Sequence, residues 1–303
     1  MSVKTLRDIN SFPEGILLKI FHHLRDLSRD IASISLTCKR WHACAVIVNY
    51  SSVSFNSQDK WNTFVSSGLL NKYAHHIESI LFSLIDLSSD DKELLLNCCT
   101  SLTSIQLLKC KNLDSDFLRD WVKSNKKTLQ SLRLWGPKLF ASSVTAVTDD
   151  FLAPVLVHCT NLKELRIIGA GITDASLLRI ATSPNSWHAL EWIDLAGCLA
   201  VTGFGVAELF SPGHLPALKN LRLEFNNKNE MDVDFFEFLA NSFPNYNFHI
   251  VVAYWYYEPR AAAKYGNMME QLAALSRRKN NVSLERRLGN TTTEEFTLYS
   301  ANS

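Results

Sequence analysis

The 303-residue sequence lacks a charge imbalance, because 31 lysines and arginines are matched by 30 aspartates and glutamates. A nucleic-acid-binding chain normally carries a basic excess, so nucleic acid is not an expected partner. No apolar run approaches the ~20 residues that a membrane helix requires. Residues 1–12, MSVKTLRDINSF, contain no apolar secretory core. We therefore expect neither membrane insertion nor export.

The cysteine pattern excludes a disulfide framework. Seven cysteines, an odd number, are spread along a chain without an export signal, so we expect reduced thiols and a cytoplasmic or nuclear location, or both. A metal site is not expected either. Cys38 and His42 share a helix face, but Cys44 does not, and no second pair supplies the remaining ligands.

Catalytic motifs are also missing. The sequence contains neither a P-loop nor a G-x-S-x-G elbow. Gly203-Phe204-Gly205 begins like a dinucleotide fingerprint, but Glu208 stands where the third glycine belongs. No pattern groups an acid, a base and a nucleophile. The chain is therefore expected to be non-catalytic and to need no cofactor.

Residues 12–45, FPEGILLKIFHHLRDLSRDIASISLTCKRWHACA, carry a helical pattern. Pro13 suits the first position of a helix, where its missing N–H costs nothing. Apolar residues then recur on one side of that helix, at Ile16, Leu17, Ile20, Phe21 and Leu24. Asp30 is expected to cap a second helix, whose stripe contains Ile31, Ile34, Cys38, Trp41 and Ala45. A unit of ~45 residues rarely buries enough surface to stand alone, so it should pack on the next part of the chain.

This stretch resembles an F-box. The matching positions are Phe12-Pro13-Glu14, Ile16-Leu17, Ile20-Phe21, Leu24 and Cys38-Lys39-Arg40-Trp41. Three positions depart from the family pattern, since Phe12 replaces the usual Leu, Gly15 a frequent acidic residue and Thr37 a common Val.

The resemblance implies a three-helix module, residues 1–56, that docks on the Skp-type adaptor of cullin-RING (SCF) ubiquitin ligases. Cullin and RING subunits would join through that adaptor. The implied adaptor face consists of Phe12, Pro13, Ile16, Leu17, Ile20, Phe21, Leu24, Cys38 and Trp41. The alternative is an ordinary helical hairpin that only caps the next domain.

The rest of the chain is repetitive. The pattern Lxx(L/I)xL recurs at Leu102-Ile105-Leu107, Leu129-Leu132-Leu134, Leu162-Leu165-Ile167, Leu190-Ile193-Leu195 and Leu218-Leu221-Leu223, with an earlier copy at Ile77-Ile80-Phe82. Cys110, Cys198 and Asn226 occupy the position of ladder residues, three residues past the third apolar one. The spacing resembles cysteine-containing leucine-rich repeats. One repeat cannot bury its own apolar face, so such units are stable only as a stacked array.

The expected fold is α/β, with a leucine-rich-repeat solenoid over residues 57–258. Parallel strands should line its concave face and helices its convex face. Residues 57–74 are predicted to form a joining helix, and residues 259–303 a C-terminal helix followed by a mobile tail. An insertion at 136–149 interrupts the repeat spacing, and long connections of this kind are often functional.

The concave face is the expected place for a protein substrate. Strand alternation puts Arg133, Arg166, Asp194 and Arg222 in one outward column, with Trp135 and Trp192 on the same face. Neighbouring strands lie ~4.8 Å apart, so Arg133 and Arg166 should stand side by side and could grip an acidic or phosphorylated segment. The alternative is a solvated ladder in which Asp194 neutralises Arg166 and Arg222.

These observations favour a substrate-recognition subunit of an SCF-type E3 ubiquitin ligase. It would dock on the adaptor through the F-box and present a protein for ubiquitination on the repeats. Two other hypotheses stay open: a leucine-rich-repeat scaffold or assembly factor, and a small-molecule receptor that uses the concave pocket.

Overall fold

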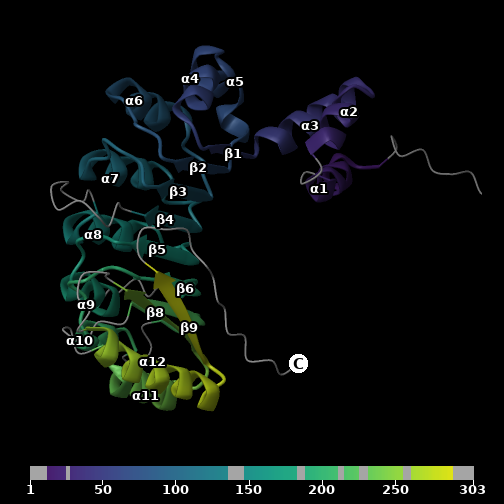
Figure 1. The fold of residues 1–303 in the computed structure, drawn as a ribbon. Helices are drawn as coiled ribbons and strands as arrows, with labels where there is room; N and C mark the ends of the chain where they lie inside the picture. Colours follow the sequence, from purple (N-terminus) through teal and green to yellow (C-terminus); the bar gives the residue numbers. More distant parts are fainter. Residues whose placement is uncertain are drawn as a thin grey trace, which may run out of the picture.

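The computed structural model describes residues 12–24, 28–135, 147–182, 188–210, 215–224, 231–254 and 261–288. The chain begins with a unit of three helices and continues as a long array in which strands and helices alternate (Figure 1). The three helices are α1 (Glu14–Leu24), α2 (Ser28–Ser35) and α3 (Lys39–Tyr50).

The three-helix unit has a small core of its own. Leu17, Phe21, Ile31, Cys44, Ala45 and Val48 form it, with half-buried apolar residues packed around them. Trp41 packs edge-on against Phe21, with ring centroids 5.4 Å apart. Most residues of the predicted apolar stripes therefore pack in or around this core, whereas Ile16 and Cys38 are exposed.

One predicted helix is two in the structure. Helical order is interrupted after Ser35, and Cys38 adopts extended backbone as the cap of α3, without a side-chain capping hydrogen bond. The predicted cap Asp30 lies inside α2 instead. The continuous stripe from Ile31 to Ala45 was misleading because a helical period survives a short turn between two helices.

The second part is a nine-stranded sheet whose strands are all parallel and follow each other in chain order. The strands are β1 (Ser52–Phe55), β2 (Ser79–Ser83), β3 (Ser104–Leu108), β4 (Ser131–Trp135), β5 (Glu164–Ile168), β6 (Trp192–Asp194), β7 (Asn220–Glu224), β8 (Asn247–Tyr254) and β9 (Val282–Leu288). Helices join the successive strands, and all the strands are parallel. This arrangement confirms the predicted α/β solenoid.

Helices cover one face of this sheet (Figure 1). They are α4 (Gln58–Ser66), α5 (Leu69–Tyr73), the 3₁₀ turn η2 (Ala74–His76), α6 (Ser89–Cys98), α7 (Ser115–Ser124), α8 (Asp149–His158), α9 (Asp174–Thr182), α10 (Gly203–Leu209), α11 (Val233–Ser242) and α12 (Ala261–Arg278). We call the opposite face of the sheet, which they leave uncovered, the open face.

The predicted repeat positions build one continuous core between the sheet and the helices. Ile80, Ile105, Leu132, Leu165, Ile193 and Leu221 follow one another in strand register and are at most 1% exposed. Cys110 and Cys198 are buried, and their thiols donate to the carbonyl oxygens of Phe82 and Ile167 on preceding strands. Each repeat thus completes the packing and hydrogen bonding of its neighbour.

A left-handed turn recurs where a strand ends. Gly169 and Gly197 have φ of 69° and 79° there, and the corresponding residues of the earlier repeats are Leu84 and Lys109, with φ of 61° and 53°. A non-glycine residue in this conformation costs roughly 1–2 kcal/mol. The first repeats therefore carry backbone strain at Leu84 and Lys109, where the later repeats have glycine.

The solenoid is longer than the predicted range of 57–258. It begins at β1, inside the segment assigned to the F-box, and ends at β9, where a mobile tail was expected. Leu272 and Leu275 of α12 and Val282 and Leu284 of β9 belong to the same core. The polar composition of this segment concealed the strand, because the buried Val282 and Leu284 alternate with the polar Ser283. Residues 289–303 and most of the insertion, 136–146, lie outside the described residues.

Candidate functional site

The first candidate surface lies on the three-helix unit. Of the nine residues predicted to face an adaptor, Pro13, Ile16 and Cys38 are exposed, while Phe12, Ile20, Leu24 and Trp41 are half-buried. Leu17 and Phe21 are 0% and 1% exposed, so their assignment to the face is corrected: they hold the unit together. The five apolar residues of α1 cannot all face a partner, because the helix buries the middle of this stripe in the core of its own unit.

One exposed apolar residue was missed. Leu36 is 86% exposed, next to the break between α2 and α3, while Ile16 on α1 is 44% exposed. Large apolar side chains left in solvent on a unit with a closed core mark a contact surface when they lie together with others. Leu36 had no signal in the helical pattern, because its exposure results from the turn at residues 36–38.

The three-helix unit joins the solenoid directly. Only Ser51 separates α3 from β1, and its carbonyl oxygen accepts hydrogen bonds from the backbone N–H groups of Glu78 and Ser79 at 2.8 and 2.9 Å. Tyr50 stacks on Tyr73 with ring centroids 4.1 Å apart. Burial of Tyr50, together with the neighbouring Tyr73, raises the pKa of its phenol. This packing fixes the orientation of the unit relative to the sheet.

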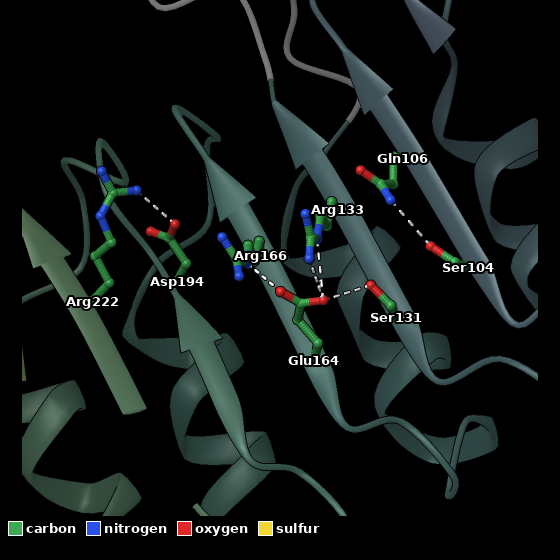
Figure 2. A network of polar contacts seen from close by, with 8 residues as sticks. All are labelled: Ser104, Gln106, Ser131, Arg133, Glu164, Arg166, Asp194 and Arg222. Carbon is green, nitrogen blue, oxygen red and sulfur yellow. Dashed lines mark hydrogen bonds and ion pairs between the residues drawn. The ribbon is translucent and has the colours of Figure 1, made fainter. Parts of the chain in front are cut away.

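The second candidate surface is the open face. Figure 2 shows its polar side chains, with the helices behind the strands. The register places Gln106, Arg133, Arg166, Asp194 and Arg222 in one row across β3 to β7. The predicted column is therefore correct, and Arg133 and Arg166 are register partners on adjacent strands.

Glu164 organises the two arginines. Its carboxylate accepts hydrogen bonds from Arg133 Nε and Nη2 at 3.1 and 2.9 Å, from Arg166 Nε, and from Ser131 Oγ at 2.8 Å (Figure 2). Arg166 also lies over the ring of Trp192, 4.6 Å from its centroid. The two guanidinium groups are thus held side by side by one carboxylate.

The pKa of the Glu164 carboxyl reports this arrangement. Burial acts to raise the pKa, but hydrogen bonds from Arg133 and Ser131 and the charges of both arginines outweigh it, and the pKa is lowered. The carboxylate is therefore ionised at neutral pH. Glu164 was missed from the sequence, although its position two residues before Arg166 in a strand puts both side chains on one face.

The other predicted members of the column form a separate pair. Arg222 Nη1 donates to Asp194 Oδ2 at 2.7 Å, and the side chains are 13% and 0% exposed. In the ladder hypothesis Asp194 neutralises Arg222 and Arg166, and the structure bears this out for Arg222 alone. A buried pair of this kind is not available to a ligand, because separating it leaves an uncompensated buried charge.

An apolar row runs beside the arginines. Leu108, Trp135 and Ile168 are register partners on β3, β4 and β5, and all three are half-buried. Lys109 lies over the Trp135 ring, 4.9 Å from its centroid. The open face therefore offers large apolar side chains next to a cationic cluster.

Metal ligands do not gather in the described part of the chain, where no group of three or more His, Cys, Asp or Glu side chains could hold a metal ion. No described helix is both long and apolar enough to span a bilayer. A pocket of about 330 Å³ opens at the edge where strands β3 to β6 begin, and six of its seven lining residues are of polar types.

Comparison with known proteins gives a partial match. Residues 9–53 match the family model described as F-box-like, which covers the three-helix unit and the start of β1. No curated protein matches the sequence. Among solved structures the chain is similar to one described as "Crystal structure of Rad7 and Elc1 complex in yeast", with a TM-score of 0.42 and 13% identity over 92% of this chain and 90% of that chain. The F-box-like region is thus the three-helix unit at the head of the solenoid.

Proposed function

We propose that this protein is a substrate-recognition subunit of an SCF-type E3 ubiquitin ligase. The three-helix unit docks on a Skp-type adaptor, and through it on cullin and RING subunits, while the leucine-rich-repeat solenoid presents a protein substrate. The observation that carries the proposal is the F-box-like match on a unit that has a closed core and leaves the large apolar residues Ile16 and Leu36 exposed. Such a subunit works in the cytoplasm or nucleus.

The scaffold alternative, in which the helices only cap the solenoid, fits the packing less well. The first end of the solenoid core is closed by α4 and α5, whose Trp61 and Leu70 are 0% and 1% exposed. The three-helix unit has a separate core and projects away from the sheet (Figure 1). A cap would share the core that it covers, so this unit is better suited to a partner.

A receptor of this kind needs no bond chemistry of its own. It raises the effective concentration of the substrate and orients a lysine toward the conjugating enzyme. The direct passage from α3 to β1 supports this role, because a fixed angle between the docking unit and the open face orients whatever the face binds.

The experiment is capture of the adaptor by the intact chain with Ile16→Asp and Leu36→Asp combined. Central interface anchors contribute at least about 2 kcal/mol each, or about thirty-fold in affinity, so capture should be lost. Phe21 is unsuitable for this test because it lies in the core. Val157→Asp with Leu199→Asp is the matched control, since these solenoid residues are 51% and 50% exposed. Equal adaptor capture by both double variants would contradict the docking proposal.

A further inference from the structure

The Arg133–Glu164–Arg166 cluster leaves part of each guanidinium group uncommitted. Arg133 directs Nε and Nη2 at one oxygen of Glu164, and Arg166 directs Nε at the other. Among the described residues, none accepts a hydrogen bond from Nη1 of Arg133 or from the Nη atoms of Arg166. The two arginine side chains are 36% and 27% exposed, so the cluster is partly accessible to solvent.

We propose that this cluster is a preformed receptor for a single carboxylate that is flanked by large apolar side chains, in an extended acidic segment of a partner protein. The inference rests on the proposed function, because it names the substrate class of the same open face. A planar carboxylate matches the fork of a guanidinium group in a bidentate pair. Glu164 holds both guanidinium groups in place before a ligand binds, and the Trp192 ring also supports that of Arg166.

The charge of the cluster selects the ligand. Two guanidinium groups share one carboxylate, so the cluster carries about one net positive charge. Attraction to the cluster grows in proportion to the ligand's charge, whereas the cost of removing the ligand from water grows with its square. A monoanion is matched by this site, and a dianionic phosphate is opposed by the Glu164 carboxylate at its base.

The spacing of the open face specifies the flanking residues. Trp135 lies two residues after Arg133, and Ile168 two after Arg166, so each pair points to the same side about 7 Å apart. Residues two apart in an extended peptide have the same spacing and also share a side. A segment of the form apolar-x-Glu-x-apolar therefore fits in either direction, with an apolar side chain on the row of Leu108, Trp135 and Ile168.

The test uses the full chain and degenerate undecapeptide pools with Leu-X-Glu-X-Leu fixed at the centre. Parallel pools replace the glutamate by glutamine or phosphoserine, or both leucines by serine. We expect the protein to retain the Leu-X-Glu-X-Leu pool at least about fivefold more than each of the other pools. This retention should fall as the salt concentration rises, because the site is partly exposed. Arg133→Gln with Arg166→Gln should abolish the excess, and Arg119→Gln on the exposed surface of α7 is the control.

A charge-altering variant sharpens the test. Glu164→Gln removes the negative charge at the base of the site, so retention should shift toward the phosphoserine pool. A preference of the unaltered protein for phosphoserine, or equal retention of the Glu and Gln pools, would overturn the proposal. So would binding that appears only after removal of residues 289–303, since Glu294 and Glu295 of the chain would then be the competing occupant. Adaptor capture, measured on the same proteins, separates this outcome from failure of the proposed function.

Discussion

Glu164→Gln is expected to destabilise the solenoid by about 1–3 kcal/mol at neutral pH. The carboxylate accepts hydrogen bonds from two arginines and from Ser131, and its side chain is 16% exposed. A hydrogen bond to a charged group contributes about 1.5–3 kcal/mol, but solvent screens both arginines, which places the total near the value of one such bond. The variant also leaves two like charges on adjacent strands ~4.8 Å apart.

The effect should depend on pH in a defined direction. The pKa of Glu164 is lowered in the folded protein from its usual value near 4.5, despite the opposing effect of burial. A group with a lowered folded-state pKa contributes stability above its unfolded pKa and loses it as the pH falls through the folded one. The difference between the original protein and the variant should therefore be full at pH 7 and shrink below about pH 4.

The measurement is urea unfolding monitored by far-UV circular dichroism at pH 7 and pH 3.5, compared through the midpoint and slope. Glu191→Gln is the matched control, because that glutamate pairs with Lys219 at the exposed edge of the sheet and should matter less. Equal midpoints for the original protein and Glu164→Gln at pH 7 would refute the reasoning. A deficit of the same size at both pH values would refute the linkage to ionisation.

Three further outcomes are expected. Gly205→Ala should destabilise the fold by about 1–3 kcal/mol, because the added Cβ would lie 2.2 Å from an oxygen of Asp174. Gly15→Ala should stabilise the fold by about 0.5–1 kcal/mol, because no atom lies within 4 Å of the added Cβ. Thermal unfolding of both variants measures the two effects. In native protein at pH 8 a thiol reagent should modify the exposed Cys38 first, since burial raises the pKa of thiols such as Cys99 to about 12. All seven cysteines should react after unfolding. A Cys38 that does not react in the native protein, or fewer than seven reactive thiols after unfolding, would contradict this. A chelator should leave the unfolding temperature unchanged, and a lowered temperature would indicate a structural metal.

Much of the fold can be read from the sequence alone. The repeat of Leu or Ile at fixed spacing predicted strands β2 to β7, their order and their buried faces, because each repeat interacts only with its neighbours and a one-dimensional pattern is enough to describe such a stack. Strands β1 and β9 lay outside that pattern. The alternation within strands likewise placed Arg133 and Arg166 side by side. The F-box-like pattern located the helical unit through the same apolar periodicity.

The tertiary structure decided what lies beyond that pattern. Helical periodicity does not distinguish a buried stripe from a contact face, so only packing showed that Leu17 and Phe21 are core and that Leu36 is exposed. The pairing of Glu164 with two arginines depends on side-chain conformations across strands about thirty residues apart in sequence, and a local pattern carries no such information. The sequence likewise placed charges on the open face, whereas the structure decided which of them pair: Glu164 with two arginines, and Asp194 with Arg222.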